Sequence, residues 1–424
     1  MTMIRIYIIA PLLIFSNPTY AYLDPGSGNA LMYLLVSLGG ALTFSIKNLY
    51  YRIIGKKIKQ EEVNNNNFDL VIFSEGKQYW GTFKPLIEEL LKRKIAFKYY
   101  TMDIYDPALE IDNNLINSRF LGYGDIAYAR LSQCNAKFFI STTPNIGCPN
   151  YPLKRPKNVE KLIYISHAVS DISYLKKGAL DNYDVVLDIA KWCEKRLRVV
   201  ESNRKLKRKE FYPVGLLYLD ELVKNYASIM TLTNKKNQKT ILIAPSWGKK
   251  SCLHTHGHLF ITELLEQGYR IIFRPHPQSF ISELNFIKEI IIKNSKFPNF
   301  IIDKARDSIA SIKESDILIS DSSSFKFDYA FVHKKPVITL YVPLSDLDSY
   351  EGGEFEGLWE DDVLDKIGYV VHKDNVVPMR EIIEKTLNKD VSQIENIYNE
   401  LVCNHGMAKE SIVDWLETKL KEGK

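Results

Sequence analysis

Short apolar runs rich in β-branched and aromatic residues recur along the chain from residue 69, and stretches with helical spacing separate them. In the first half, runs of strand length occupy residues 69–73, 95–100, 137–141 and 161–166. Residues 83–93 carry apolar positions at the spacing of an α-helix. Strands that alternate with helices predict a parallel, doubly wound α/β sheet.

The second half repeats this pattern. Residues 240–248 read as a strand that ends in a turn, and further strands are expected at 269–273, 316–319 and 368–371. Helices are expected at 325–332, 379–387 and 394–420, and the last two should cross back and brace the first domain. A chain of 424 residues with 46% hydrophobic content can bury two cores of ordinary domain size.

The predicted organisation has six parts. These are a signal-like segment (1–21), a transmembrane helix (28–51), a basic and asparagine-rich linker (52–67), an N-terminal α/β domain (68–233), a C-terminal α/β domain (238–388) and C-terminal helices (389–424).

The N-terminal segment has the pattern of a membrane attachment. Residues 1–21 combine a single positive charge at Arg5 with an apolar run at 6–15, as signal peptides do. Residues 30–46 carry no charge and are just long enough to span a bilayer. Lysine and arginine residues follow at 47–59, which predicts that the rest of the chain lies on the cytoplasmic side of the inner membrane. A cleaved signal followed by one span and an uncleaved hairpin that turns at 22–28 both remain open.

Two polar clusters follow predicted strands in the second half. Arg274 and His276 come directly after the strand at 269–273, and residues 320–324 read Ser-Asp-Ser-Ser-Ser after the strand at 316–319. Ligands bind at the carboxyl ends of strands in open α/β sheets, and a serine-rich helix start accepts phosphate through its N–H groups. The two clusters together predict a diphosphate site. Taken singly, each is also explained as a helix cap or a surface turn.

A histidine ends a strand in the first half. His167 follows the strand at 161–166, so it is expected on the ligand-binding edge of the first domain. A neutral imidazole can take the proton of an attacking hydroxyl, and Asp171 is a candidate to orient it. A structural role for a single histidine at this position remains the alternative.

At these residues the chain resembles the CDP-glycerol glycerophosphotransferase family, which comprises teichoic-acid-type polymerases and primases with the GT-B fold. The family pattern Arg-x-His-Pro, then Ser/Thr-Asp-x-Ser-Ser-x-x-Phe-Asp, is met by residues 274–277 and 320–328. The resemblance implies a GT-B-like fold, in which two Rossmann-like domains face a cleft. Where the family has a His-Gly-Thr motif with the general base, this chain has His167, Ala168 and Val169.

The resemblance also implies roles for individual residues. His167 would deprotonate the acceptor hydroxyl, and Arg274 and His276 would stabilise charge as CMP leaves. A turn similar to the family's Ala-Pro-Thr-Trp places Ser246 and Trp247 toward the donor. The remaining residues expected at the donor phosphates are Ser320, Asp321, Ser323, Ser324 and Asp328.

The implied activity moves glycerol phosphate, or a related alditol phosphate, from a CDP-activated donor to a lipid-linked glycan or polyol-phosphate acceptor. No cofactor is expected, and the sequence demands no metal. A glycosyltransferase that uses a nucleotide sugar on the same scaffold is the first alternative. A catalytically silent membrane scaffold that binds nucleotide or glycan is the second.

Charge and cysteine usage agree with this picture. The formal net charge is +5, and nine positive residues gather between Lys191 and Lys209. Such a cluster suits an anionic membrane surface or a polyanionic acceptor better than base-specific nucleic-acid recognition, and a solvated helix face explains it equally well. The five scattered cysteines predict neither a disulfide framework nor a zinc site. The three histidines at 254, 256 and 258 lack carboxylate or cysteine at ligand spacing.

Overall fold

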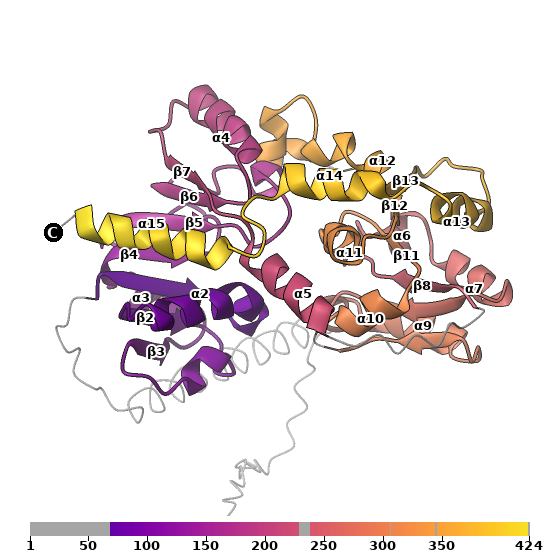
Figure 1. Cartoon of the computed structure of the whole chain (residues 1–424), viewed down its shortest axis with the longest axis horizontal. Coiled ribbons are helices and arrows are strands. Elements are labelled where there is room, and N and C mark those ends of the chain that lie inside the picture. Colours follow the sequence, from indigo (N-terminus) through magenta and orange to yellow (C-terminus); the bar gives the residue numbers. More distant parts are fainter. Residues whose placement is uncertain (1–67, 229–237, 306, 344–345, 423–424) are drawn as a thin grey trace, which may run out of the picture. The chain divides into compact units, whose positions relative to one another are not determined.

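The computed structural model describes residues 68–228, 238–305, 307–343 and 346–422, and these contain two parallel β-sheets (Figure 1). The first sheet has seven strands in the order β3-β2-β1-β4-β5-β6-β7. Its strands are β1 (Leu70–Ser74), β2 (Phe97–Thr101), β3 (Ile116–Phe120), β4 (Asn135–Ser141), β5 (Asn158–Ile165), β6 (Val185–Asp188) and β7 (Glu210–Pro213). All of its strand pairs are parallel.

The second sheet has six strands in the order β10-β9-β8-β11-β12-β13, again all parallel. Its strands are β8 (Thr240–Ile243), β9 (Arg270–Phe273), β10 (Phe300–Ile302), β11 (Ile317–Ser320), β12 (Val337–Leu340) and β13 (Gly368–Val371). The predicted α/β class with two doubly wound sheets is confirmed.

Helices connect the strands, as parallel pairing requires. They are α2 (Trp80–Lys92), α3 (Gly124–Leu131), α4 (Trp192–Asn203), α5 (Leu217–Ser228), α6 (Cys252–Thr255), α7 (Leu259–Glu266), α8 (Ser279–Ser282), α9 (Leu284–Asn294), α10 (Ile309–Glu314), α11 (Phe325–His333), α12 (Leu364–Ile367), α13 (Met379–Leu387), α14 (Ser392–Leu401) and α15 (Ala408–Glu422).

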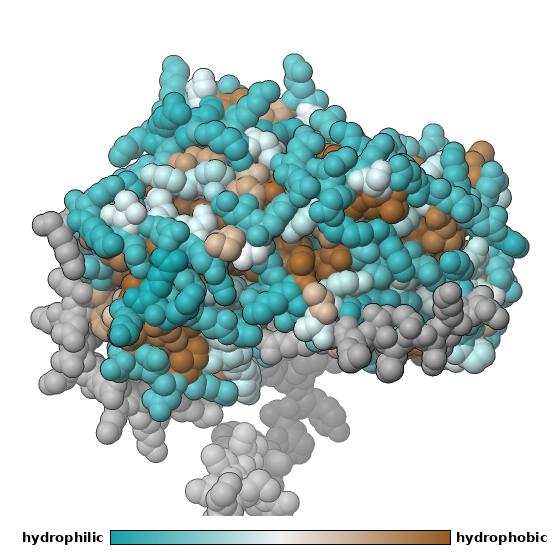
Figure 2. Space-filling view, viewed as in Figure 1, coloured by the Kyte–Doolittle hydropathy of each residue, from teal (hydrophilic) through white to brown (hydrophobic). Residues whose placement is uncertain are grey.

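The apolar side chains of the strands pack on both faces of each sheet. In β1, Leu70 and Ile72 join one hydrophobic cluster, whereas Val71 and Phe73 join another. Successive side chains of a strand point to opposite faces, so a strand buried on both sides reads as a continuous apolar run. The face of the molecule in Figure 2 is mostly hydrophilic, and hydrophobic residues show through in separate patches.

A third hydrophobic cluster joins the two sheets. It contains Ile189 and Leu219 from the first domain together with Leu242 and Phe327 from the second. Since these side chains pack into one core, the carboxyl ends of the two sheets are held at a fixed separation by ordinary apolar burial.

Of the helices expected to cross back, α15 packs on the first domain, whereas α13 contacts β12 and β13 of the second sheet. The helix expected at 394–420 is divided into α14 and α15. Helix α15 contacts α2, and its buried Ile412 and Leu416 belong to the cluster that covers the first sheet (Figure 1). The crossing depends on Gly215, which has a φ of 89°. A Cβ atom there would lie 2.6 Å from the carbonyl oxygen of Cys403, so a side chain is sterically excluded.

The strands that the sequence prediction lacked include β3, β7, β10 and β12. Strand β12 is buried but only four residues long, and the other three lack a continuous apolar run. Strand β3 has the sequence INSRF, and β7 and β10 are at least partly exposed along their length. A polar or half-exposed edge strand gives a weak hydrophobic signal.

Among the described residues, no helix has both the length and the apolar character needed to cross a membrane. The signal-like segment, the transmembrane helix and the linker predicted at 1–67 lie outside those residues.

The packing of α15 on the first sheet predicts how substitutions in this helix change the free energy of unfolding. Ile412 is fully buried, so Ile412→Ala should lower the free energy of unfolding by about 2–5 kcal/mol through lost burial and a cavity. The exposed Thr418→Ala on the same helix is the matched control and should change it by less than about 0.5 kcal/mol. Urea unfolding followed by circular dichroism measures both, and equal effects of the two substitutions would contradict this packing.

Candidate functional site

Three turns meet at one edge of the second sheet. Strand β8 pairs with β9 on one side and with β11 on the other, so the turns after these strands lie next to each other. The two polar clusters therefore share an edge, as predicted. They are not consecutive units, however, because β10 and α10 intervene in sequence and β8 lies between them in the sheet.

Asp321 fastens two of these turns together. Its fully buried carboxylate accepts hydrogen bonds from the N–H and Oγ of Ser246, both at 2.9 Å, from the Cys252 N–H at 2.7 Å and from the Ser323 N–H at 3.2 Å. The buried Ser320 hydroxyl donates to the carbonyl of Ala244 at 2.6 Å. Ser320 and Asp321 were expected to contact the donor phosphates, and the structure corrects this expectation. Both side chains lie beneath the turn and hold its backbone in place.

Asp328 also departs from its expected role. It is partly buried in α11, accepts a hydrogen bond from the Tyr218 hydroxyl, and thereby links α11 to α5. Desolvation raises the pKa of this carboxyl to about 7. Asp328 does not line the cavity described below, so its observed role is to join the two helices.

Arg274 and His276 emerge from the end of β9. A guanidinium nitrogen of Arg274 lies 2.5 Å from Asp303, which fixes the side chain while leaving 17% of it exposed. Nδ1 of His276 accepts a hydrogen bond from the Gln278 N–H at 3.1 Å. Burial lowers the pKa of His276, so the neutral ring carries its proton on Nε2, where it can be donated to a ligand oxygen.

Trp247 stands beside this histidine. Its ring centroid lies 6.3 Å from that of His276, and the side chain is 48% exposed. Such exposure of a large aromatic next to polar groups suits contact with a ligand better than core packing. The neighbouring Ser246 hydroxyl is already used by Asp321.

His167 faces the second domain across a cavity of about 250 Å³. Ser322 and Ser324 at the start of α11 line the opposite wall. Nδ1 of His167 is buried without a hydrogen-bond partner in the part of the chain that the structure describes. Burial lowers its pKa to about 4, so the imidazole is neutral at physiological pH and able to accept a proton.

Asp171 lines the same cavity but does not bond to His167. Its carboxylate lies 3.0 Å from Nε of Arg196 and accepts a hydrogen bond from the Ser173 N–H at 2.8 Å. Arg196 also donates to the Gly357 carbonyl of the second domain at 2.8 Å. Asp171 thus fixes the loop after His167, whereas the orientation of the imidazole relies on packing against Tyr79, whose ring centroid is 5.2 Å away.

The cavity residues that sequence reasoning missed include Tyr174, Lys326, Trp359 and Glu360. Nζ of Lys326 lies 2.8 Å from Glu360, and the Tyr174 hydroxyl donates to the same carboxylate. A lysine between two phenylalanines near a helix start is a signal that could have marked Lys326. Glu360 lies in an acidic stretch where no local pattern singles it out.

That acidic stretch, residues 346–362, packs against the first domain. Tyr350 pairs with Lys176 in an isolated β-bridge, and the buried Glu351 lies 2.9 Å from Arg204. Arg196 lies over the Phe355 ring at 4.6 Å. This segment is therefore an ordered strap between the domains.

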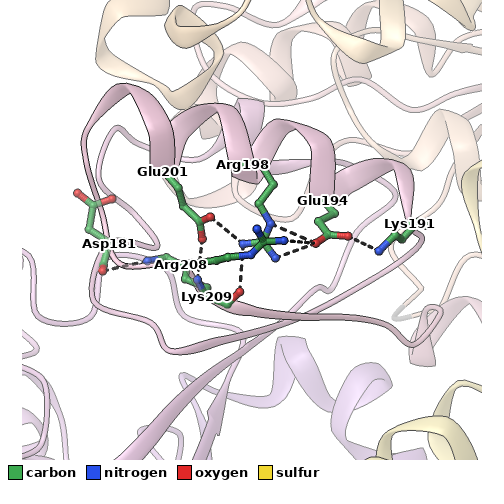
Figure 3. Close-up of polar contacts among 7 residues, drawn as sticks. All are labelled: Asp181, Lys191, Glu194, Arg198, Glu201, Arg208 and Lys209. Atoms are coloured by element: carbon green, nitrogen blue, oxygen red, sulfur yellow. Dashed lines mark hydrogen bonds and ion pairs between the residues drawn. The ribbon is translucent and has the colours of Figure 1, made fainter.

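The positive cluster at 191–209 is largely compensated within the first domain. Figure 3 shows Arg198 between Glu194 and Glu201, at 2.8 and 2.7 Å, with Lys191 on the far side of Glu194. Such pairs on a helix face are ordinary solvated structure, which favours that alternative over a surface for polyanions.

The three closely spaced histidines have separate environments. Nε2 of His254 lies 2.9 Å from Glu283, and its ring stacks on Phe286 at 4.0 Å. The described residues contain no group of three or more histidine, cysteine or acidic side chains arranged to hold a metal ion.

Solved structures share this fold. The wall teichoic acid polymerase TagF matches with a TM-score of 0.54 and 16% identity, over 91% of this chain and 98% of that one. A glycosyltransferase from Rickettsia africae matches at 0.52 and 14% identity over 83% and 98%, and a UDP-GlcNAc 2-epimerase from Methanocaldococcus jannaschii at 0.54 and 13% over 82% and 99%. At these identities the similarity shows the GT-B-like fold alone. No curated protein matches the chain.

The sequence itself carries a family assignment. Residues 180–390 match the family model described as CDP-glycerol:poly(glycerophosphate) glycerophosphotransferase, a range that includes the turns after β8, β9 and β11 and the strap. Residues 180–390 therefore form a CDP-glycerol:poly(glycerophosphate) glycerophosphotransferase family domain, and the protein is a transferase.

Proposed function

We propose that the protein transfers glycerol phosphate, or a related alditol phosphate, from a CDP-activated donor to a lipid-linked glycan or polyol-phosphate acceptor and releases CMP. The observation that carries the proposal is the cavity in which the neutral imidazole of His167 faces the serine-rich start of α11. The family of residues 180–390 supports the donor class. So does a solved form of TagF soaked with CDPG, which has the same fold.

The reaction follows from the chemistry of the two walls. His167 takes the proton of the acceptor hydroxyl, and the resulting oxygen nucleophile attacks the distal phosphorus of the donor diphosphate. The new P–O bond forms as the bond to the bridging oxygen breaks, and the electron pair leaves with CMP. Arg274, His276, Ser323 and Ser324 stabilise the phosphate charges through a guanidinium, an N–H donor and the N-terminus of α11.

The acceptor side of the proposal involves the membrane. A lipid-linked acceptor is presented at a bilayer surface, and the apolar segment at 28–51 with its basic flank would hold the catalytic domains at the cytoplasmic face of the inner membrane. We expect the full chain in the membrane fraction after ultracentrifugation and residues 60–424 in the supernatant. Release of the full chain by high salt alone would contradict a spanning helix, because salt weakens surface electrostatics but not apolar insertion.

A donor panel tests the function. The purified full chain, incubated with CDP-glycerol, other CDP-alditols, CMP-sugars or UDP-sugars and a lipid-linked acceptor, should release CMP from a CDP-alditol. Nucleotide release from a sugar donor instead would establish the glycosyltransferase alternative. Tight CMP binding without turnover of any donor would favour the scaffold.

Replacement of the proposed base separates chemistry from binding. His167→Ala should lower kcat by about 10²–10⁴-fold while the Kd for CMP changes less than about threefold, since the imidazole acts in proton transfer. The exposed His405→Ala is the control for loss of an imidazole elsewhere and should leave both values unchanged. Loss of CMP binding in His167→Ala would contradict the assignment.

The lowered pKa of His167 predicts how kcat/KM changes with pH. Because burial lowers the pKa of His167 to about 4, the base stays unprotonated well below the ordinary histidine value of 6.5. The acid limb of kcat/KM, which reports groups of the free enzyme, should therefore fall toward pH 4 and not near pH 6.5.

A further inference from the structure

The wall of the cavity opposite His167 consists of hydrogen-bond donors that the sequence motif does not include. Lys326 and Trp359 line the cavity beside Ser322 and Ser324. Trp359 is 5% exposed, and its Nε1 has no hydrogen-bond partner in the described ranges of the chain. A buried donor without an acceptor is unfavourable, so a ligand oxygen that reached this N–H would be stabilised by it.

Lys326 is held as a buried cation at this wall. It is 1% exposed and donates to the carbonyls of Asp321 at 3.2 Å and Ser323 at 3.4 Å. Its third partner is the carboxylate of Glu360 at 2.8 Å. The two carbonyls belong to the turn at residues 320–324. Lys326 therefore holds this turn in place, and its ammonium lies next to the cavity.

Glu360 is the partner that a ligand can replace. Both carbonyls are fixed parts of the turn, whereas Glu360 comes from the strap and itself lines the cavity. Burial lowers the pKa of Lys326 and raises that of Glu360, so the charged form of each depends on the opposite charge 2.8 Å away. A phosphoryl oxygen would supply Lys326 with one while being repelled by ionised Glu360.

We propose that Lys326 and the indole N–H of Trp359 bind the phosphoryl group in this cavity, and that Glu360 occupies Lys326 as an internal counter-ion until the anion displaces it. The identity of that group as the donor's distal phosphate rests on the proposed function. The anion site itself stands on the buried donors.

Displacement of Glu360 by an anion would also change a contact that the strap makes with the first domain. The second oxygen of Glu360 accepts from the Tyr174 hydroxyl, which lies in the 3-10 turn Ile172–Tyr174 shortly after His167. Exchange of Glu360 for a phosphate therefore changes a contact between the domains beside the base. Phosphate binding and the local closure of the cleft are coupled through this carboxylate.

Titration of the full chain with inorganic pyrophosphate by isothermal calorimetry tests the proposal. Glu360→Gln removes the competing charge but keeps an acceptor for Lys326, so it should bind pyrophosphate about fivefold to tenfold more tightly. Lys326→Met should bind at least about tenfold more weakly. Trp359→Phe keeps the ring and loses the N–H, and about threefold to tenfold weaker binding is expected.

Glu351→Gln is the matched control, because Glu351 is a buried carboxylate of the same strap that pairs with Arg204 and does not line the cavity. Its pyrophosphate affinity should stay within about twofold of the unmodified protein. Circular dichroism of each variant verifies folding, and should Lys326→Met not fold, Glu360→Gln and Trp359→Phe decide the question.

Tighter binding is the outcome that a purely structural Glu360 would not produce. Unchanged or weaker binding in Glu360→Gln, an equal gain in Glu351→Gln, or no pyrophosphate binding by the unmodified protein each overturns the proposal. CMP release from CDP-glycerol by the unmodified protein is measured separately. Failure of that reaction alone would reject the proposed donor while the pyrophosphate affinities still decide the anion site.

Discussion

The donor side of the site depends on one buried carboxylate. Asp321 accepts four hydrogen bonds from two turns that lie far apart in sequence, and hydrogen bonds to a charged acceptor contribute about 1.5–3 kcal/mol each. Its charge needs those donors because a buried carboxylate without them would be strongly unfavourable. The mutual dependence fixes the N–H groups at the start of α11 before any ligand arrives, and such preorganisation is what electrostatic catalysis requires.

The opposite wall uses burial in a different way. In the part of the chain that the structure describes, no carboxylate bonds to His167, and desolvation keeps its ring neutral. An aspartate bonded to the imidazole would favour the protonated ring, so the pairing of Asp171 with Arg196 keeps the imidazole uncharged. A neutral imidazole also avoids an ion pair with an approaching phosphate. Under the proposed function, this wall therefore does not compete with the start of α11 for an anion.

Much of the fold was accessible from the sequence because parallel strands buried on both faces read as apolar runs, as in β1 and β11. The edge strand β10 was missed because its side chains stay partly in water. The motif identified turns that the structure brings to one edge of the sheet, but it could not rank their side chains. Spacing does not distinguish Ser324, which lines the cavity, from Asp328, which bonds to Tyr218 instead. Lys326 and Glu360 pair through the tertiary fold, and no local pattern joins them.

The strap explains how a two-domain transferase can remain organised around an open cavity. Its anchor to the first domain is the buried pair of Glu351 and Arg204, whose separation would leave an uncompensated charge and is therefore costly. Glu360, in contrast, lies where a ligand can supply the replacement charge for Lys326. One segment thus combines a contact that must persist with a contact that an anion can exchange. Ligand entry can then adjust the cleft locally, while the core shared by the two sheets stays intact.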